Sequence, residues 1–201
     1  MLPISVDLAQ IRVLLVGGGA AARRRLALLD EAGAAALNVY APEPEAELAK
    51  LAGSRLHRRW SSPAEIAQAQ LVFLAGVPEP AASEICRVAK AAGVLVNVED
   101  DRQRSDFHSA AVIRRGDLTV AISTNGRSPG LAALMRQVLD RRIGPEWELR
   151  LGQLESLRAA WRAAGADPAA VARHTREWVV GQGWLDPTPS ASSHEPPRPI
   201  P

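Results

Sequence analysis

The chain has 201 residues, of which 47% are hydrophobic, so it can form one globular domain, or one domain with a small appendage. Its formal net charge of only +2 excludes the strong positive field that nucleic-acid binding needs, although nearly all of its basic residues are Arg. A lone Cys86 in an apolar helical pattern excludes a disulfide framework, and without a signal peptide or a membrane-length apolar run we expect a cytoplasmic protein that binds no membrane.

Apolar runs of strand length alternate with helical patterns through the first half of the chain. We expect strands at 11–16, 36–41, 56–60, 71–75 and 94–98, and helices at 21–32, 42–52, 63–69 and 79–92. This alternation predicts an α/β fold of the Rossmann type, in which a parallel sheet carries helices on both faces.

The pattern changes after about residue 105. Residues 110–124 predict two strands joined by a turn at 115–117, and Ser128-Pro129 then starts a helix that ends before Gly144-Pro145. Two further helices follow, one at 146–164 and one that starts at Asp167-Pro168. We therefore expect a small α+β segment and then a helical region.

A glycine-rich motif links the first strand to the first helix. It has the form G-x-G-x-x-A, in which Gly17 allows the tight turn, Gly19 allows close approach of a diphosphate, and Ala22 lets the helix pack on the strand. The position between a strand and a helix favours a dinucleotide site over a glycine-rich turn of another kind. We expect the dinucleotide to contact Gly17, Gly19, Ala20, Ala21 and Ala22.

The acidic residue that binds the ribose in such folds is expected near the end of the second strand. Glu43 is the acid closest to that point, although it comes slightly late, and Asn38 or the backbone is the alternative. No Arg follows the strand to bind a 2′-phosphate, so the sequence favours NAD over NADP.

Three segments of the chain carry a more specific signal. They read GGGAAARRRLALLDEAGA, VNVEDD and DFHSAAVIRRGDLTVAISTNGRSPGLAALMRQVLD. Together they resemble the precorrin-2 dehydrogenase / sirohydrochlorin ferrochelatase family, which is also the N-terminal module of bacterial siroheme synthase. The resemblance extends from about residue 2 to residue 185.

This resemblance implies an intertwined homodimer that oxidises precorrin-2 to sirohydrochlorin with NAD⁺ in siroheme or cobalamin biosynthesis. Some members also insert Fe²⁺, and a non-catalytic module that binds NAD or a tetrapyrrole is a further alternative. The implied domains are an NAD-binding Rossmann domain at 1–112, a dimerisation segment at 113–144, a C-terminal helical domain at 145–185 and, from its Pro/Ser-rich composition, a disordered tail at 186–201.

The family's key acid ends its N-V-x-D stretch, which places it here at Asp100. The resemblance implies that this residue is the general base. Its position after an apolar strand agrees with that role, because ligands bind at the carboxyl ends of such strands and partial burial would raise its pKa. Asp101 is the alternative base, or it solvates a turn.

Precorrin-2 carries carboxylates around its periphery, and Arg side chains can hold them as forks. The resemblance and the Arg clustering together point to a set of substrate-binding residues, although each of them could instead lie on a solvated turn. This set consists of His108, Arg114, Arg115, Thr124, Asn125, Arg127 and Ser128.

The chain departs from the family after the strand at 71–75. Relatives continue with polar residues there, whereas this chain reads Gly76-Val77-Pro78, so the Gly76 backbone would have to replace their contacts with the cofactor. Thr124 stands where many relatives carry Ser. No group of residues has the spacing of metal ligands, and we expect the four C-terminal Trp residues to be packing anchors, with tetrapyrrole stacking as the alternative.

Overall fold

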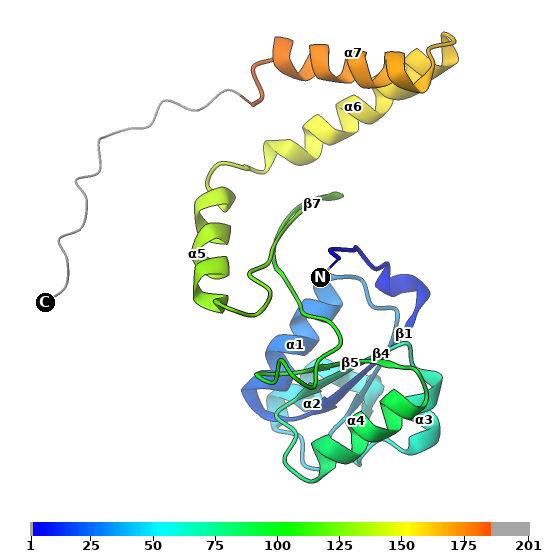
Figure 1. The fold of residues 1–201 in the computed structure, drawn as a ribbon, viewed down its shortest axis with the longest axis vertical. Coiled ribbons are helices and arrows are strands. Elements are labelled where there is room, and N and C mark those ends of the chain that lie inside the picture. The colour runs from blue at the N-terminus through cyan, green and yellow to red at the C-terminus, as the bar shows by residue number, and fades with distance from the viewer. Residues whose placement is uncertain (1, 186–201) are drawn as a thin grey trace, which may run out of the picture. The chain divides into compact units, whose positions relative to one another are not determined.

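The structure is a computed structural model that describes residues 2–185, so the tail expected at 186–201 lies outside the described residues. It divides into two compact units between Ser109 and Ala110. The first unit holds a five-stranded sheet (Figure 1). Its strands are β1 (Arg12–Gly17), β2 (Ala36–Tyr40), β3 (Leu56–His57), β4 (Leu71–Ala75) and β5 (Leu95–Val98). Its helices are α1 (Gly19–Glu31), α2 (Ala46–Ala52), α3 (Pro63–Gln68) and α4 (Ala81–Ala91), with short 3-10 turns at Leu8–Gln10 and Gly53–Arg55.

All five strands are parallel and run in the order β3-β2-β1-β4-β5. The expected Rossmann-like sheet is therefore confirmed. The chain builds outward from β1 to β3 and then returns to the other side of β1 with β4. This change of direction leaves a crevice at the carboxyl ends of β1 and β4, where open α/β sheets bind their ligands.

Each face of the sheet has its own apolar core, because successive strand residues point to opposite faces. Val13 and Leu15 pack with α1 and α2, whereas Leu14 and Val16 pack with α3 and α4. Each fully buried side chain of this size contributes about 1.5–3 kcal/mol. Cys86 lies in the second core, as expected, and burial raises the pKa of its thiol.

The strand expected at 56–60 is shorter than the sequence indicated. It ends at His57, because the backbone N–H of Arg59 turns back to donate to the His57 carbonyl at 2.9 Å. The Arg59 guanidinium then reaches Glu65 at 2.6 Å, and Ser62 forms a capping box with Glu65 at the start of α3. Side-chain contacts of α3 therefore end the strand.

Three helices begin at other residues than the sequence predicted. The helix expected at 79–92 begins at Ala81, with Pro80 as its N-cap. The helix expected at 42–52 begins at Ala46, because Pro44 disfavours the helical conformation for Glu43 before it. The helix expected from residue 21 begins earlier, at Gly19, inside the glycine motif.

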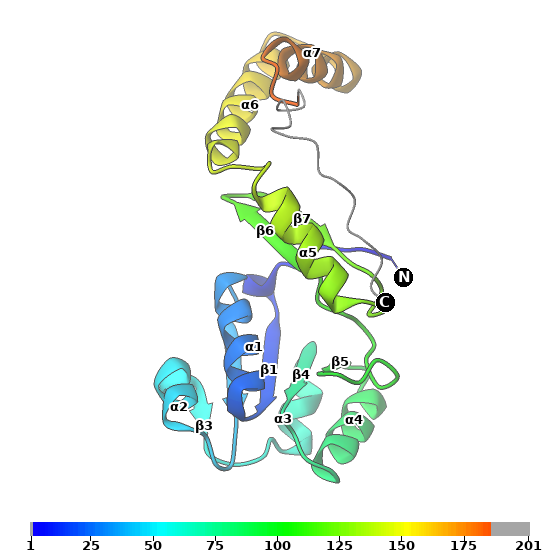
Figure 2. The same ribbon diagram turned by 90° about the vertical axis from the view of Figure 1, so that its left-hand side faces the viewer.

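The second unit contains an antiparallel pair of strands beside a helix, followed by two further helices (Figure 2). Its elements are β6 (Ala111–Arg115), β7 (Leu118–Ile122), α5 (Pro129–Asp140), α6 (Glu146–Ala163) and α7 (Pro168–Gly181). The Ser128 and Asp167 side chains cap α5 and α7. The expected α+β segment and helical region are thus confirmed. Within residues 2–185, no helix combines the length and apolarity needed to cross a membrane.

Aromatic contacts join the two C-terminal helices. Trp147 and Trp184 meet edge to face with ring centroids 6.3 Å apart, and the Arg150 guanidinium lies 5.0 and 5.2 Å from those two rings. Trp161 packs against His174 at 5.3 Å. For Trp147, Trp161 and Trp184 these contacts agree with the expectation of packing anchors, whereas Trp178 is 38% exposed.

We predict that Ala22→Val destabilises the chain by about 1–3 kcal/mol, because Ala22 is 0% exposed and added methyl groups would force α1 away from the sheet. Urea unfolding at neutral pH measures the loss. Ala20→Val is the matched control, since Ala20 is exposed on the same helix and bears the same cost in helix propensity. Equal losses for both variants would contradict the tight contact.

Candidate active site

The turn from β1 into α1 touches the end of β4 through backbone atoms alone. The Gly18 N–H donates to the Ala75 carbonyl at 3.0 Å. A Cβ at Gly17 would lie 1.9 Å from that same carbonyl oxygen, and a Cβ at Gly76 would lie 2.5 Å from the Gly18 oxygen. Both glycines also have positive φ values, +133° and +69°. The sequence therefore needs glycine on both sides of this contact.

The N-terminus of α1 is open to an anion. Its N-cap is Gly18, no side chain caps it, and its first turn holds no acidic residue. Unpaired N–H groups and the helix dipole favour negative charge at such a position. Beside Gly19, the atom nearest to an added Cβ is Glu45 Oε1, at 3.9 Å. The geometry leaves room for a diphosphate to approach.

The acid that lies beside this turn is Glu45 rather than Glu43. Both residues are exposed and Pro44 separates them, but only Glu45 lies within 4 Å of a Cβ placed on Gly19. The Glu45 carboxylate lies 3.7 Å from Arg23, whose guanidinium also pairs with Glu47. The sequence places both acids after β2, and only the structure distinguishes them.

A cavity of about 260 Å³ lies at the carboxyl ends of β4 and β5, beside the first turns of α1. Three of the residues singled out from the sequence line it, namely Ala21, Gly76 and Asp100. Charged side chains of other elements line it as well: Arg24, Glu99 and Arg104. Ala21 of the expected dinucleotide motif thus lines the same cavity as the expected catalytic acid, whereas Gly17 and Gly19 are not among its lining residues.

Asp100 sits in a tight turn directly after β5. Its φ is +60°, a left-handed conformation that Asp tolerates better than most residues. The Asp101 N–H closes the turn by donating to the Val98 carbonyl at 3.2 Å. Asp100 is exposed in the chain rather than partly buried as we expected, so its carboxylate is open to solvent.

Asp101 is committed to the structure of this turn. Its carboxylate accepts the backbone N–H groups of Gln103 and Arg104 at 3.0 Å and the Arg104 Nε at 2.5 Å. The backbone and side chain of Arg104 hold the pKa of Asp101 below its ordinary value. Of the two neighbouring acids, Asp100 is the one that lines the cavity.

The loop after this turn covers the outer edge of β5. The Asp106 carboxylate accepts the Val96 N–H and the Ser105 hydroxyl accepts the Val98 N–H, each at 2.9 Å. Buried Asn97 donates from its amide to a backbone carbonyl of the same loop at 2.9 Å. Sequence reasoning missed these three residues, although their polar side chains around an apolar strand were the available signal.

Arg104 links the loop to α4. Its guanidinium pairs with Asp101 and with Glu79, and Glu79 also accepts the Ser83 hydroxyl at 2.7 Å. Ser83 and Arg104 together lower the pKa of Glu79. Arg104 thus anchors the turn that contains Asp100 to the N-terminal end of α4.

The other residues expected to bind substrate lie outside this cavity. His108 follows the loop in the first unit, half-buried, and the rest belong to the second unit. Arg115 holds β6 to the end of α5, with its Nε donating to the Ile143 carbonyl at 2.8 Å and Nη2 to Asp140 at 2.8 Å. Arg114 precedes it on β6.

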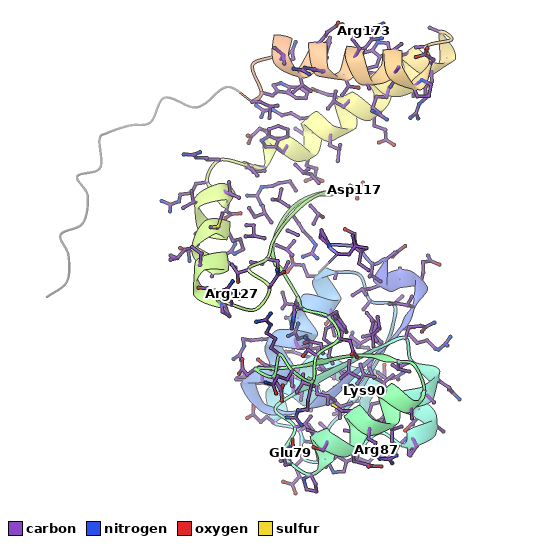
Figure 3. The ribbon with its side chains drawn as sticks, in the orientation of Figure 1. Glu79, Arg87, Lys90, Asp117, Arg127 and Arg173 are labelled. Atoms are coloured by element: carbon purple, nitrogen blue, oxygen red, sulfur yellow. The ribbon has the colours of Figure 1, made fainter. Side chains whose placement is uncertain are left out.

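Side-chain hydroxyl groups of the loop before α5 form hydrogen bonds with the backbone of the same loop. Thr124 Oγ1 donates to the Ser128 carbonyl at 3.0 Å and accepts the Ser128 N–H at 3.1 Å. Asn125 adopts a φ of +53° at the tip. Figure 3 shows Arg127 at the N-terminal end of α5 and Asp117 at the tip of the β6–β7 hairpin. Asn125 and Arg127 are exposed, so this loop presents an amide and a guanidinium to solvent.

Comparison with known proteins adds two family matches. A family model described as "Putative NAD(P)-binding" matches residues 4–111, and one described as "Sirohaem biosynthesis protein central" matches residues 115–142. The first match covers the whole parallel sheet and the glycine turn. It shows that the first unit binds a nicotinamide dinucleotide.

Curated relatives carry the name siroheme synthase. That of Tolumonas auensis is 33% identical over 92% of this chain and 42% of its own length. Siroheme synthase 3 of Aeromonas hydrophila is 39% identical over 69% of this chain and 30% of its own length. The chain therefore spans less than half of the length of these relatives.

A solved structure has the same fold. It is titled "SirC, precorrin-2 dehydrogenase" and superimposes with a TM-score of 0.71 at 23% identity, over 92% of this chain and 93% of its own. This likeness extends through both units.

We predict that Arg104→Gln makes the stability of the chain depend less steeply on pH in acid. Asp101 and Glu79 have pKa values below their ordinary 3.8 and 4.5, so their stabilisation is present above about pH 5 and is lost as the pH falls through their lowered pKa values. The urea midpoint, measured from pH 7 to pH 3, should fall less steeply in the variant. Arg141→Gln is the control, because the Arg141 guanidinium donates to the backbone carbonyl of Gln137 rather than to a carboxylate with a lowered pKa. Parallel curves for the wild type and Arg104→Gln would refute this assignment.

Proposed function

Because this chain belongs to the precorrin-2 dehydrogenase and siroheme synthase family, we propose that it is an NAD-dependent dehydrogenase that oxidises precorrin-2 to sirohydrochlorin in the cytoplasm. The observation that carries the proposal is the cavity that Gly76 and Asp100 share beside the N-terminus of α1. When bound there, NAD⁺ supplies the hydride acceptor.

The residues of the chain bind the cofactor, accept the proton and bind the substrate. The open N-terminus of α1 binds the diphosphate, and the glycine contact keeps that helix end against β4. Removal of a hydride from carbon also releases a proton, which the Asp100 carboxylate accepts as general base and passes to solvent. Asn125 and Arg127 bind carboxylates of the tetrapyrrole, and His108 contributes a further polar group.

Three of the expected substrate-binding residues instead stabilise the loop before α5 and the β6–β7 hairpin through hydrogen bonds. Thr124 and Ser128 hold the loop that presents Arg127, and Arg115 holds β6 to α5. Arg114 joins the binding surface from the same strand.

The charges after β2 favour NAD over NADP. Glu43 and Glu45 would repel a 2′-phosphate, and Glu45 lies beside Gly19. Arg23, the cation close to them, pairs with Glu45 and Glu47. A ribose with two free hydroxyl groups suits these acids better than a phosphorylated one.

A homodimer is the proposed assembly. Along α5 an apolar stripe recurs with helical spacing: Leu131, Leu134, Met135 and Val138 are 51%, 60%, 45% and 47% exposed. A single chain rarely leaves such a stripe in water, so a second copy of this chain is its proposed cover. This assigns the dimerisation role to residues 113–144.

We predict that Asp100→Asn lowers the turnover of precorrin-2 with NAD⁺ by roughly 100-fold or more, as expected for loss of a general base. Asn also tolerates the left-handed backbone, so the turn should remain folded. The measurement is the rise in NADH absorbance. Asp101→Asn should retain turnover within about tenfold, because that carboxylate faces Arg104. Wild-type turnover by Asp100→Asn would refute the role, and NAD⁺ binding without turnover by the wild type would favour a non-catalytic module.

We predict that Leu134→Glu converts the dimer to a monomer, because a charge would be buried in the proposed interface. Sedimentation equilibrium gives the mass. Ala133→Glu is the control, since Ala133 is exposed on the opposite side of α5 and should leave the dimer intact. A wild-type chain that sediments as a monomer would count against the assembly.

A further inference from the structure

Glu99 extends the sheet by one residue beyond β5. Its N–H donates to the Leu74 carbonyl at 2.9 Å, so its backbone still pairs with β4. Side chains alternate along a strand, and Glu99 therefore points to the same face as Asn97, the face covered by α1. There the Arg24 Nη2 of α1 lies 3.1 Å from Glu99 Oε1. One carboxylate oxygen is thus fixed by an ion pair.

The other oxygen of this carboxylate has no hydrogen-bond donor among the described residues, although the half-buried Arg25 interacts with the charge of Glu99. Glu99 Oε2 is buried and accepts no hydrogen bond from residues 2–185, although the side chain as a whole is 21% exposed. Glu99 lines the same cavity as Asp100. A buried carboxylate oxygen without a donor is unfavourable, and a ligand that supplied an O–H or N–H group would relieve it.

The dinucleotide brings few groups that can donate. Its phosphates only accept hydrogen bonds, whereas its ribose hydroxyls, the nicotinamide amide and the adenine amino group donate them. ADP-ribose lacks the nicotinamide and so separates its amide from the neighbouring ribose. The diphosphate is assigned to the start of α1, so the part of the ligand beyond it on the β4–β5 side enters this cavity. At the end of β4 the cavity is lined by Leu74, Gly76 and Val77, which offer no polar side chain to a sugar.

We propose that Glu99 Oε2 accepts a hydrogen bond from a hydroxyl of the nicotinamide-side ribose, while Arg24 holds Oε1. This inference rests on the proposed function. It makes Glu99 a cofactor-binding residue that replaces polar side chains missing after β4. Asp100 beside it remains free for the proton. A pyrrole N–H of the substrate is the competing donor, and the choice of ligands below separates the two.

The test is calorimetric titration of wild type, Glu99→Ala and Glu99→Gln with three nucleotides in the absence of tetrapyrrole. NAD⁺ and ADP-ribose contain the second ribose, whereas ADP lacks it. Loss of a hydrogen bond to a charged acceptor should weaken NAD⁺ and ADP-ribose binding to Glu99→Ala roughly tenfold or more and leave ADP binding unchanged. Glu99→Gln should lose less affinity for NAD⁺ and ADP-ribose, since its amide oxygen can still accept a hydrogen bond.

Glu84→Gln is the matched control, because Glu84 also pairs with an Arg at 2.6 Å but lies outside the cavity. It should bind all three nucleotides like the wild type, and each variant's melting temperature checks its fold. Unchanged binding of NAD⁺ by Glu99→Ala would overturn the inference and leave the dinucleotide site intact, as would an equal loss for ADP. A wild type that binds none of the three nucleotides would instead overturn the proposed function.

Discussion

The close approach of two backbone segments, the turn after β1 and the end of β4, is the contact on which the site depends. Neither Gly17 nor Gly76 has space for a Cβ, because a Cβ on either residue would collide with a carbonyl oxygen of the other segment. The hydrogen bond from Gly18 to Ala75 joins the two segments directly. This contact sets the position of the start of α1 against the sheet, and Gly76 beside it lines the cavity. A side chain here would move the helix end and the cavity wall together.

Three consecutive acids after β5 have different surroundings because of simple geometry. Strand alternation directs Glu99 toward α1, where Arg24 meets it. The left-handed turn at Asp100 then breaks the alternation, and Asp101 folds back to cap the backbone of its own loop. The backbone thus places an ion-paired carboxylate, an exposed carboxylate and a structural carboxylate at adjacent positions. Their shared charge would otherwise make them equivalent.

The sequence predicted the alternation of strands and helices, because strands buried on both faces read as continuous apolar runs. It also indicated the glycine turn and Asp100, since both follow such runs directly. It failed where tertiary contacts decide: Arg59 and Glu65 shorten β3, and Pro44 delays α2. The choice of Glu45 over Glu43 and the buried oxygen of Glu99 also depend on neighbours far apart in the chain. No local pattern carries that information.

The loop at Ser105 and Asp106 has a consequence for how copies of this chain can associate. It occupies the N–H groups along the free side of β5, so no foreign strand can add there. The opposite border, β3, pairs through only two residues and offers little template for growth. Open-ended stacking of sheets into fibres is therefore blocked at both borders. The apolar stripe exposed along α5 therefore accompanies a sheet whose borders disfavour uncontrolled strand addition.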